Sequence, residues 1–283
     1  LQNIFNSGEK FNLYWKNDGS KQTSFNLGTE LPYLFKSPIG VKANLRIFKQ
    51  DSTFQNTITD LNLGYYFSYN TKAYLGYQKT NSADIQNTNS FSINNFTNTF
   101  LTSSLEHTTF STDNFIFPEK TKVNLKLGTG NRTIETNKTK QTFVQLEMSH
   151  HLELNSKNSI FIKNQSYYLQ SDSYVINELY RFGGINSIRG FNENSLQANA
   201  FTGIMAEFRY LVASNLYLHS ITDYGYFQDK TANIEEKLLG LGFGFGLFTK
   251  NGLVNLIYAN GSTSDQAIKF SNSIVHISFK TNF

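Results

Sequence analysis

The feature that most constrains this chain is a two-residue period of apolar and polar side chains, which recurs along its length. In residues 142–154, Val144, Leu146 and Met148 fall on one side of an extended segment and polar side chains fall on the other. The same alternation recurs at residues 41–47, 60–67 and 123–127. Successive side chains of a β-strand point to opposite faces, so the pattern predicts an all-β protein. Soluble sheets alternate too, so the period alone does not identify the solvent on each face.

The lengths of the segments and of their connections identify that solvent. We count about fifteen strand-like segments of roughly 8 to 15 residues, longer than the roughly 5 to 6 residues usual in soluble sheets. Tight connections are expected at residues 69–72, 155–158, 213–215 and 249–252. Long polar connections are expected at residues 80–90, 130–140, 171–196, 229–236 and 261–272. Short turns alternating with long loops are typical of outer-membrane barrels, so we predict one domain, 1–283, folded as a transmembrane antiparallel β-barrel.

Composition removes several other classes of protein. Aromatic residues make up 15% of the 283 residues, which argues against a disordered chain. No segment reaches the roughly 18 to 20 consecutive apolar residues of a membrane-spanning helix. The chain contains no Cys, so disulfides, thiolate zinc sites and cysteine nucleophiles are excluded. Its net charge of +4 comes from scattered Lys and Arg, so we expect no nucleic-acid partner.

The last segment has the pattern of a strand that ends on an aromatic residue. One face carries apolar side chains and the other carries His276, Ser278 and Lys280. The apolar face consists of Val275, Ile277, Phe279 and the terminal Phe283. Outer-membrane barrels commonly end on such a strand.

A glycine-rich segment between the strand-like regions carries a motif that resembles one known family. Residues 178–191 contain the pair Gly183-Gly184, followed by Ile188, Arg189, Gly190 and Phe191. This segment resembles the signature loop of the BamA-type outer-membrane assembly superfamily, in which a Gly-Gly pair precedes an Arg-Gly-Phe triplet. The resemblance implies that the loop folds back into the barrel lumen. It also implies that Arg189 meets an acidic residue on the inner wall.

The rest of the chain is similar to the same family, in order. Five strand-like segments follow the loop, as they do in the family's sixteen-stranded barrel. Residues 207–210 are similar to its Glu-x-Arg-Tyr strand and residues 222–225 to its Phe-x-Asp-x-Gly segment, although Ile221 replaces the Phe. Residues 3–9 resemble the Asn-Leu-Phe-Gly-x-Gly segment near the start of the barrel. The resemblance implies sixteen strands in the full protein, about fifteen of them here, with the first strand and the POTRA domains upstream.

The parity of the strands suggests partners for the loop. A buried Arg stays ionised and is tolerated only when it is paired and hydrogen-bonded. Asp223 and Glu207 lie on the polar faces of their segments, so they are the candidate partners of Arg189. Glycines alternate along one face of a later segment and would leave room for an inserted loop. These glycines are Gly240, Gly242, Gly244 and Gly246.

Enzymatic and metal-binding interpretations are weaker. Alternating glycines within a strand do not form a nucleotide-binding turn. His150 and His151 are adjacent on a strand and therefore point to opposite faces, which disfavours a metal site. Ser187 lacks the Gly-x-Ser-x-Gly spacing of a hydrolase and has no recognisable His partner. We therefore expect no catalytic residue, metal or cofactor, and no enzyme.

The resemblance implies a role in the outer membrane of a Gram-negative bacterium. It implies insertion and folding of β-barrel proteins through a lateral seam, of which residues 274–283 would form one side. The implied partners are outer-membrane lipids including lipopolysaccharide, unfolded β-barrel substrates and accessory lipoproteins. The alternatives are a dedicated translocation transporter, either TamA-like or of the two-partner secretion type, and a passive porin.

Overall fold

The computed structural model of the chain describes residues 8–17, 22–86, 93–112, 114 and 116–280. Within these residues the regular elements are β-strands and three short 3-10 turns. None of the described helical segments is long or apolar enough to cross a membrane. The alternation in the sequence therefore produces the all-β architecture that it predicts.

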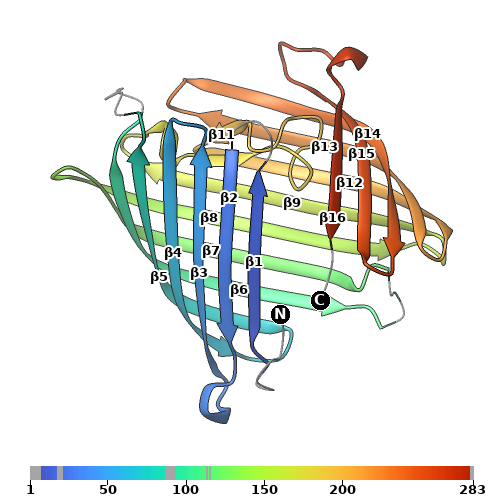
Figure 1. Cartoon of the computed structure of the whole chain (residues 1–283), viewed down its shortest axis with the longest axis horizontal. Coiled ribbons are helices and arrows are strands. Elements are labelled where there is room, and N and C mark those ends of the chain that lie inside the picture. Colours follow the sequence, from blue (N-terminus) through green and yellow to red (C-terminus); the bar gives the residue numbers. More distant parts are fainter. Residues whose placement is uncertain (1–7, 18–21, 87–92, 113, 115, 281–283) are drawn as a thin grey trace. The chain divides into compact units, whose positions relative to one another are not determined.

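Fourteen strands form one sheet in which each strand neighbours the next one along the chain (Figure 1). A two-stranded sheet, β10–β11, lies within the connection between β9 and β12. The strands of the large sheet are β1 (Lys10–Asn17), β2 (Gln22–Leu31), β3 (Ile39–Gln50), β4 (Phe54–Tyr66), β5 (Thr71–Asp84), β6 (Phe96–Phe110), β7 (Glu119–Ile134), β8 (Asn137–Glu153), β9 (Asn158–Ser171), β12 (Ala200–Ala213), β13 (Leu216–Asp229), β14 (Ile234–Thr249), β15 (Gly252–Ser262) and β16 (Ile274–Lys280). Five of them follow the loop, as the sequence suggested.

The sheet holds fourteen strands among the described residues, where the sequence suggested about fifteen. Individual strands reach 17 residues, so fewer strands account for the same length of chain. The long polar connection expected at 130–140 is wrong: β7 and β8 run through it and turn at 135–136. The connection expected at 229–236 is shorter, because β14 begins at Ile234. The strands of a barrel can extend past the hydrocarbon layer, and their ends are then polar. Polarity alone therefore overestimates the length of these loops.

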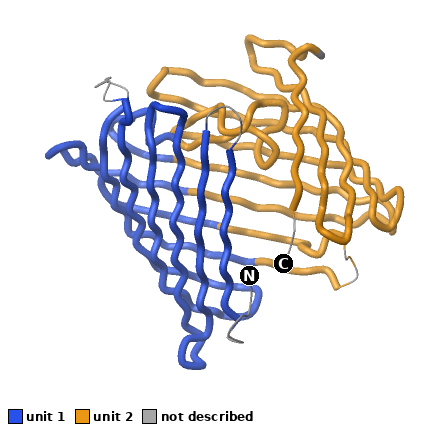
Figure 2. Tube along the Cα trace, in the orientation of Figure 1, with its two compact units in different colours: residues 1–107, 125–144, 169–179 blue, residues 108–124, 145–168, 180–283 orange. Residues whose placement is uncertain are grey.

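The chain divides into two compact units, which Figure 2 shows in blue and orange. Unit 1 comprises residues 1–107, 125–144 and 169–179, and includes β1 to β5. Unit 2 comprises residues 108–124, 145–168 and 180–283, and includes β12 to β16. Strands β6 to β9 contribute residues to both units, so no linker separates them.

Each unit has one apolar face and one polar face. On the apolar face, Leu75 and Leu101 of unit 1 and Phe243 of unit 2 are each about two-thirds exposed. On the polar face, charged side chains such as Asp60 in unit 1 and Asp223 in unit 2 are buried. Extended exposure of large apolar side chains, with buried charge behind them, is the pattern of strands that face lipid on one side only.

Candidate functional site

The loop between β9 and β12 lies at the centre of the site. It contains the 3-10 turn η2 (Ile176–Glu178) and the short strands β10 (Tyr180–Phe182) and β11 (Leu196–Ala198), which pair with each other. Gly183 and Gly184 follow β10 with φ of +99° and +95°, a backbone conformation that side chains disfavour. The tip closes when the backbone N–H of Gly184 donates to the carbonyl of Ile188 at 3.2 Å.

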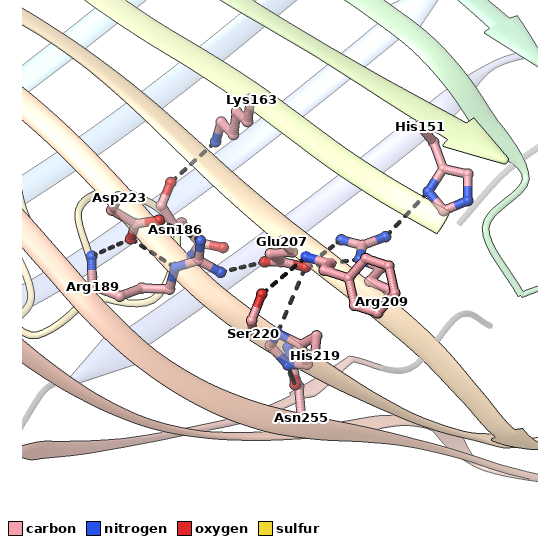
Figure 3. Close-up of polar contacts among 11 residues, drawn as sticks. His151, Lys163, Asn186, Arg189, Glu207, Arg209, His219, Ser220, Asp223 and Asn255 are labelled. Carbon is pink, nitrogen blue, oxygen red and sulfur yellow. Dashed lines mark hydrogen bonds and ion pairs between the residues drawn. The ribbon is translucent and has the colours of Figure 1, made fainter. Parts of the chain in front are cut away.

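Arg189 at the tip of the loop is bound by two acidic side chains of neighbouring strands (Figure 3). Its backbone N–H and its Nε each donate to Oδ2 of Asp223 on β13 at 2.8 Å, and a terminal nitrogen donates to Oδ1. The other terminal nitrogen donates to Oε1 of Glu207 on β12. We call Arg189, Asp223 and Glu207 the arginine clasp. These are the contacts that the strand parity suggested.

The arginine clasp is buried and charge-balanced. Arg189 is 3% exposed, and burial alone would lower its pKa. The hydrogen bonds that Arg189 donates to Asp223, together with the charge of Glu207, outweigh burial and raise the pKa of Arg189 above its ordinary value. The guanidinium therefore stays ionised, and its two carboxylate partners satisfy it in place of water.

Side chains beyond the arginine clasp hold Glu207 in position. The Nε of Arg209 donates to Glu207 at 2.7 Å, and the Nδ1 of His219 lies 3.7 Å from the same carboxylate (Figure 3). The guanidinium of Arg209 lies over the rings of Phe117 and Phe161, 4.5 and 4.2 Å from their centroids. The sequence motif includes Arg209 but did not identify these contacts.

Ile188 anchors the loop by packing. It is fully buried in a cluster that includes Phe182 and Phe201. A Cβ at Gly203 or Gly225 would lie 2.9 or 3.3 Å from the Ile188 side chain. The two glycines of β12 and β13 therefore form the recess that receives Ile188.

Gly190 allows the loop to approach β15 closely. Its φ is +88°, and a Cβ there would lie 2.4 Å from the backbone of Asn260. Its N–H donates to the Nε2 of His276 on β16 at 3.4 Å. The ring of Phe191 occupies the space above Gly261, where an added Cβ would lie 2.8 Å from it. Both glycines are needed for the contact between loop and sheet.

Of the four alternating glycines of β14, Gly240 is the one that has loop atoms among its nearest neighbours. A Cβ at Gly240 would lie 2.3 Å from the carbonyl oxygen of Arg189. The nearest atoms at Gly242, Gly244 and Gly246 belong mainly to neighbouring strands, namely the backbone of β15 and the side chains of His219 and Tyr217. Direct contact with the loop is therefore seen at Gly240, and for the other three glycines the expected role stays a prediction. A strand's glycine also accommodates bulky side chains of adjacent strands, which the period alone does not reveal.

A second attachment, in unit 1, was not predicted from the sequence. Glu178 of η2 pairs with Arg132 of β7, and both side chains are nearly inaccessible. Gln141 of β8 donates to the same carboxylate at 2.8 Å. Burial raises the pKa of Glu178 above its ordinary value, although the charge of Arg132 opposes this. Arg132 falls in the segment that its polarity assigned to a loop, so its inward direction was missed.

Asn177 extends this attachment. Its Nδ2 donates to the hydroxyl of Ser82 and to the carbonyl of Asn94, each at 2.7 Å. Its own carbonyl accepts a hydrogen bond from Asn56 at 2.6 Å. The loop is thus held at two places, by Asn177 and Glu178 in unit 1 and by the arginine clasp in unit 2. The signal that could have found Asn177 was its place next to Glu178, just before the motif.

The remaining sequence candidates have these positions. Val275, Ile277 and Phe279 of β16 are exposed on the apolar face, whereas Phe283 and residues 3–7 lie outside the described residues. Ser187 is buried, and its hydroxyl has no hydrogen-bond partner in the described part of the chain. Nor do the described histidines and carboxylates form a group that could hold a metal ion.

Comparison with solved structures assigns the fold. The chain is similar to BamA from Haemophilus ducreyi lacking POTRA domains 1–3, with a TM-score of 0.69 and 16% identity over 98% of this chain. It is also similar to CdiB from Acinetobacter baumannii and from Escherichia coli, with TM-scores of 0.68, identities of 15% and 13%, and coverage of 99% and 98% of this chain. The chain spans 66%, 55% and 57% of those three proteins. No family model and no curated protein sequence matches it.

These likenesses, together with the strand order and the loop, give the chain the fold of the BamA-type transmembrane β-barrel. The apolar faces of the two units are then the faces that contact lipid. The arginine clasp lies on the opposite face, which lines the lumen in that fold.

Proposed function

We propose that this chain is the integral outer-membrane barrel of a BamA-type protein that inserts and folds other β-barrel proteins. The observation that carries the proposal is the arginine clasp, in which a loop arginine meets Asp223 and Glu207 within the fold shared with BamA. A passive pore needs no loop fixed by a buried charge. The proposal includes no bond chemistry, cofactor or nucleic acid.

The proposed mechanism uses the edge of the sheet. Strand β16 pairs with β15, and it carries an apolar face. An edge strand presents unpaired backbone N–H and C=O groups, which can template an incoming strand by β-augmentation. Lipids including lipopolysaccharide, unfolded barrel proteins and accessory lipoproteins are the proposed partners, and POTRA domains upstream would deliver the substrate.

A second candidate is a dedicated transporter of the two-partner secretion or TamA-like type. The observation that favours it is the nearly equal structural likeness to CdiB, at a TM-score of 0.68 against 0.69 for BamA. The difference between the two candidates lies in the substrate, because one releases its client into the membrane and the other passes it across.

Depletion of the protein in its native cell, followed by quantification of the outer-membrane proteome, separates the candidates. A broad loss of barrel proteins supports the assembly role. Loss of one or a few secreted or surface proteins, with barrels intact, supports the transporter. An unchanged proteome with altered permeability to small solutes would reject both in favour of a porin. Complementation with Arg189→Ala should fail, whereas Arg46→Ala, which removes a half-exposed arginine, should restore growth.

A further inference from the structure

Beneath the loop, unit 2 contains a polar cavity that the proposed mechanism does not use. Its volume is about 370 Å³, which is within the usual range of ligand sites. Loop residues 185–187 and 189 line one side. Phe117 lies in the connection between β6 and β7, and Tyr217 and Leu253 follow the tight turns at 214–215 and 250–251, which lie at the same end of the strands. The tight turns of outer-membrane barrels face the periplasm, so a polypeptide that enters from that side would reach this cavity before the loop.

Three lysines from three strands converge on the cavity. Lys122 of β7, Lys163 of β9 and Lys280 of β16 all line it. All three ammonium groups carry the same charge and share one cavity. Bringing like charges together on a partly desolvated wall costs free energy, and a bound anion would remove that cost.

The carboxylates of the cavity leave these lysines incompletely neutralised. Glu207 already serves Arg189 and Arg209. Glu147 lies 3.6 Å from Lys163, which also donates to the carbonyl of Asn186 at 3.0 Å. In the described part of the chain, neither Lys122 nor Lys280 has an ion pair, and neither does Glu119 at the start of β7. Two ammonium groups therefore remain available to a ligand.

Aromatic side chains complete the lining. Phe117, Phe161 and Tyr217 border the cavity, and the rings of the first two contact the Arg209 guanidinium. We propose that this cavity binds an extended polypeptide segment through its carboxylate side chains, with the aromatic residues contacting the rest of the segment. The inference rests on the proposed function, since it makes the cavity a docking place for the client polypeptide.

Binding of two synthetic peptides to the detergent-solubilised chain tests the site. The probes are a ten-residue peptide of Glu, Phe and Ser, and its counterpart with Lys in place of Glu, each carrying rhodamine for fluorescence anisotropy. The test variant is K122Q/K163Q/K280Q. The control variant is K120Q/K157Q/K250Q, which also removes three positive charges. Lys120 lies at the start of β7, Lys157 in the β8–β9 connection and Lys250 in the β14–β15 connection, and none of them lines the cavity. K122Q/K280Q replaces the test variant if the loss of the Asn186 contact prevents folding on a cold gel.

The Glu peptide should bind saturably, about tenfold or more weakly to the test variant, and within about twofold of wild type to the control. Equal losses in test and control variants would show general charge attraction and overturn the site. Equal binding of the Lys peptide, no saturable binding, or displacement by an equal concentration of inorganic phosphate would overturn it as well. The assay involves no insertion or translocation. Failure of binding with an intact depletion phenotype therefore rejects the site alone, and binding without the phenotype rejects the proposed function alone.

Discussion

Replacing Arg189 by alanine should destabilise the protein by about 3–5 kcal/mol, the usual cost of breaking a buried ion pair from one side. The cost arises mainly at Asp223, whose side chain is fully buried and loses both guanidinium hydrogen bonds. Asp223 keeps the backbone N–H of residue 189, and Glu207 keeps Arg209, so neither carboxylate is left without any partner. The residual charge at Asp223 is the term that dominates.

A double-mutant cycle isolates that term. Adding Asp223→Asn to Arg189→Ala removes the stranded charge, so the double variant should be about 1–2 kcal/mol more stable than Arg189→Ala alone. The assay is urea unfolding followed by the shift in migration between heated and unheated samples on a cold gel. Arg46→Ala is the matched control, because Arg46 is half-exposed and its partner Asp60 retains Lys126, so it should cost less than about 1 kcal/mol. Additive costs of the two substitutions, or an Arg189→Ala loss no larger than the control, would refute the reasoning.

Three further predictions concern the loop and the sheet. Gly190→Ala should lower the free energy of unfolding by about 2–4 kcal/mol, because it adds backbone strain and places a Cβ 2.4 Å from the backbone of β15. Gly8→Ala is the control, since it adds similar strain but its Cβ would lie 3.4 Å from the nearest atom. It should cost about 1 kcal/mol by the same gel assay. Phe243→Lys on the apolar face should cost about 2–4 kcal/mol in lipid vesicles, while Phe243→Leu at the same position should be near neutral; equal costs would contradict the assignment of that face to lipid. Burial raises the pKa of Glu178 in the folded protein above the ordinary value of 4.5. The protonated side chain therefore contributes stability below pH 4.5, and this contribution is lost as the pH rises through the folded pKa. Glu178→Gln should flatten the resulting fall in the free energy of unfolding with pH, and an unchanged pH profile would reject the shift.

The arginine clasp could be predicted because its determinants are local. Arg189 lies in a short motif, and the faces of Asp223 and Glu207 follow from the period of their strands. The attachment in unit 1 could not be predicted in the same way. Arg132 lies in a polar segment that looked like a loop, and Asn177 is bonded to residues far away in the chain.

The polar cavity of unit 2 could not be predicted from the sequence for a related reason. Lys122, Lys163 and Lys280 are single basic residues in separate segments, which in the sequence indicated only scattered charge. Their convergence depends on which strands come together and at what register, and alternation fixes neither. The sequence predicted that strands are present more reliably than it predicted how many there are. Strands such as β7 and β8 continue through polar segments that resembled loops, so the strand boundaries were misplaced.

The two attachments of the loop differ in how much of the chain must already be in place before they form. Arg189 is 18 and 34 residues from its acidic partners, which lie on two consecutive strands. Asn177 is 83, 95 and 121 residues from Asn94, Ser82 and Asn56. Contacts between distant residues carry a larger closure entropy and form late. The tip of the loop should therefore contact the β12–β13 hairpin early in folding. The contacts of Asn177 should form only after the N-terminal strands have assembled.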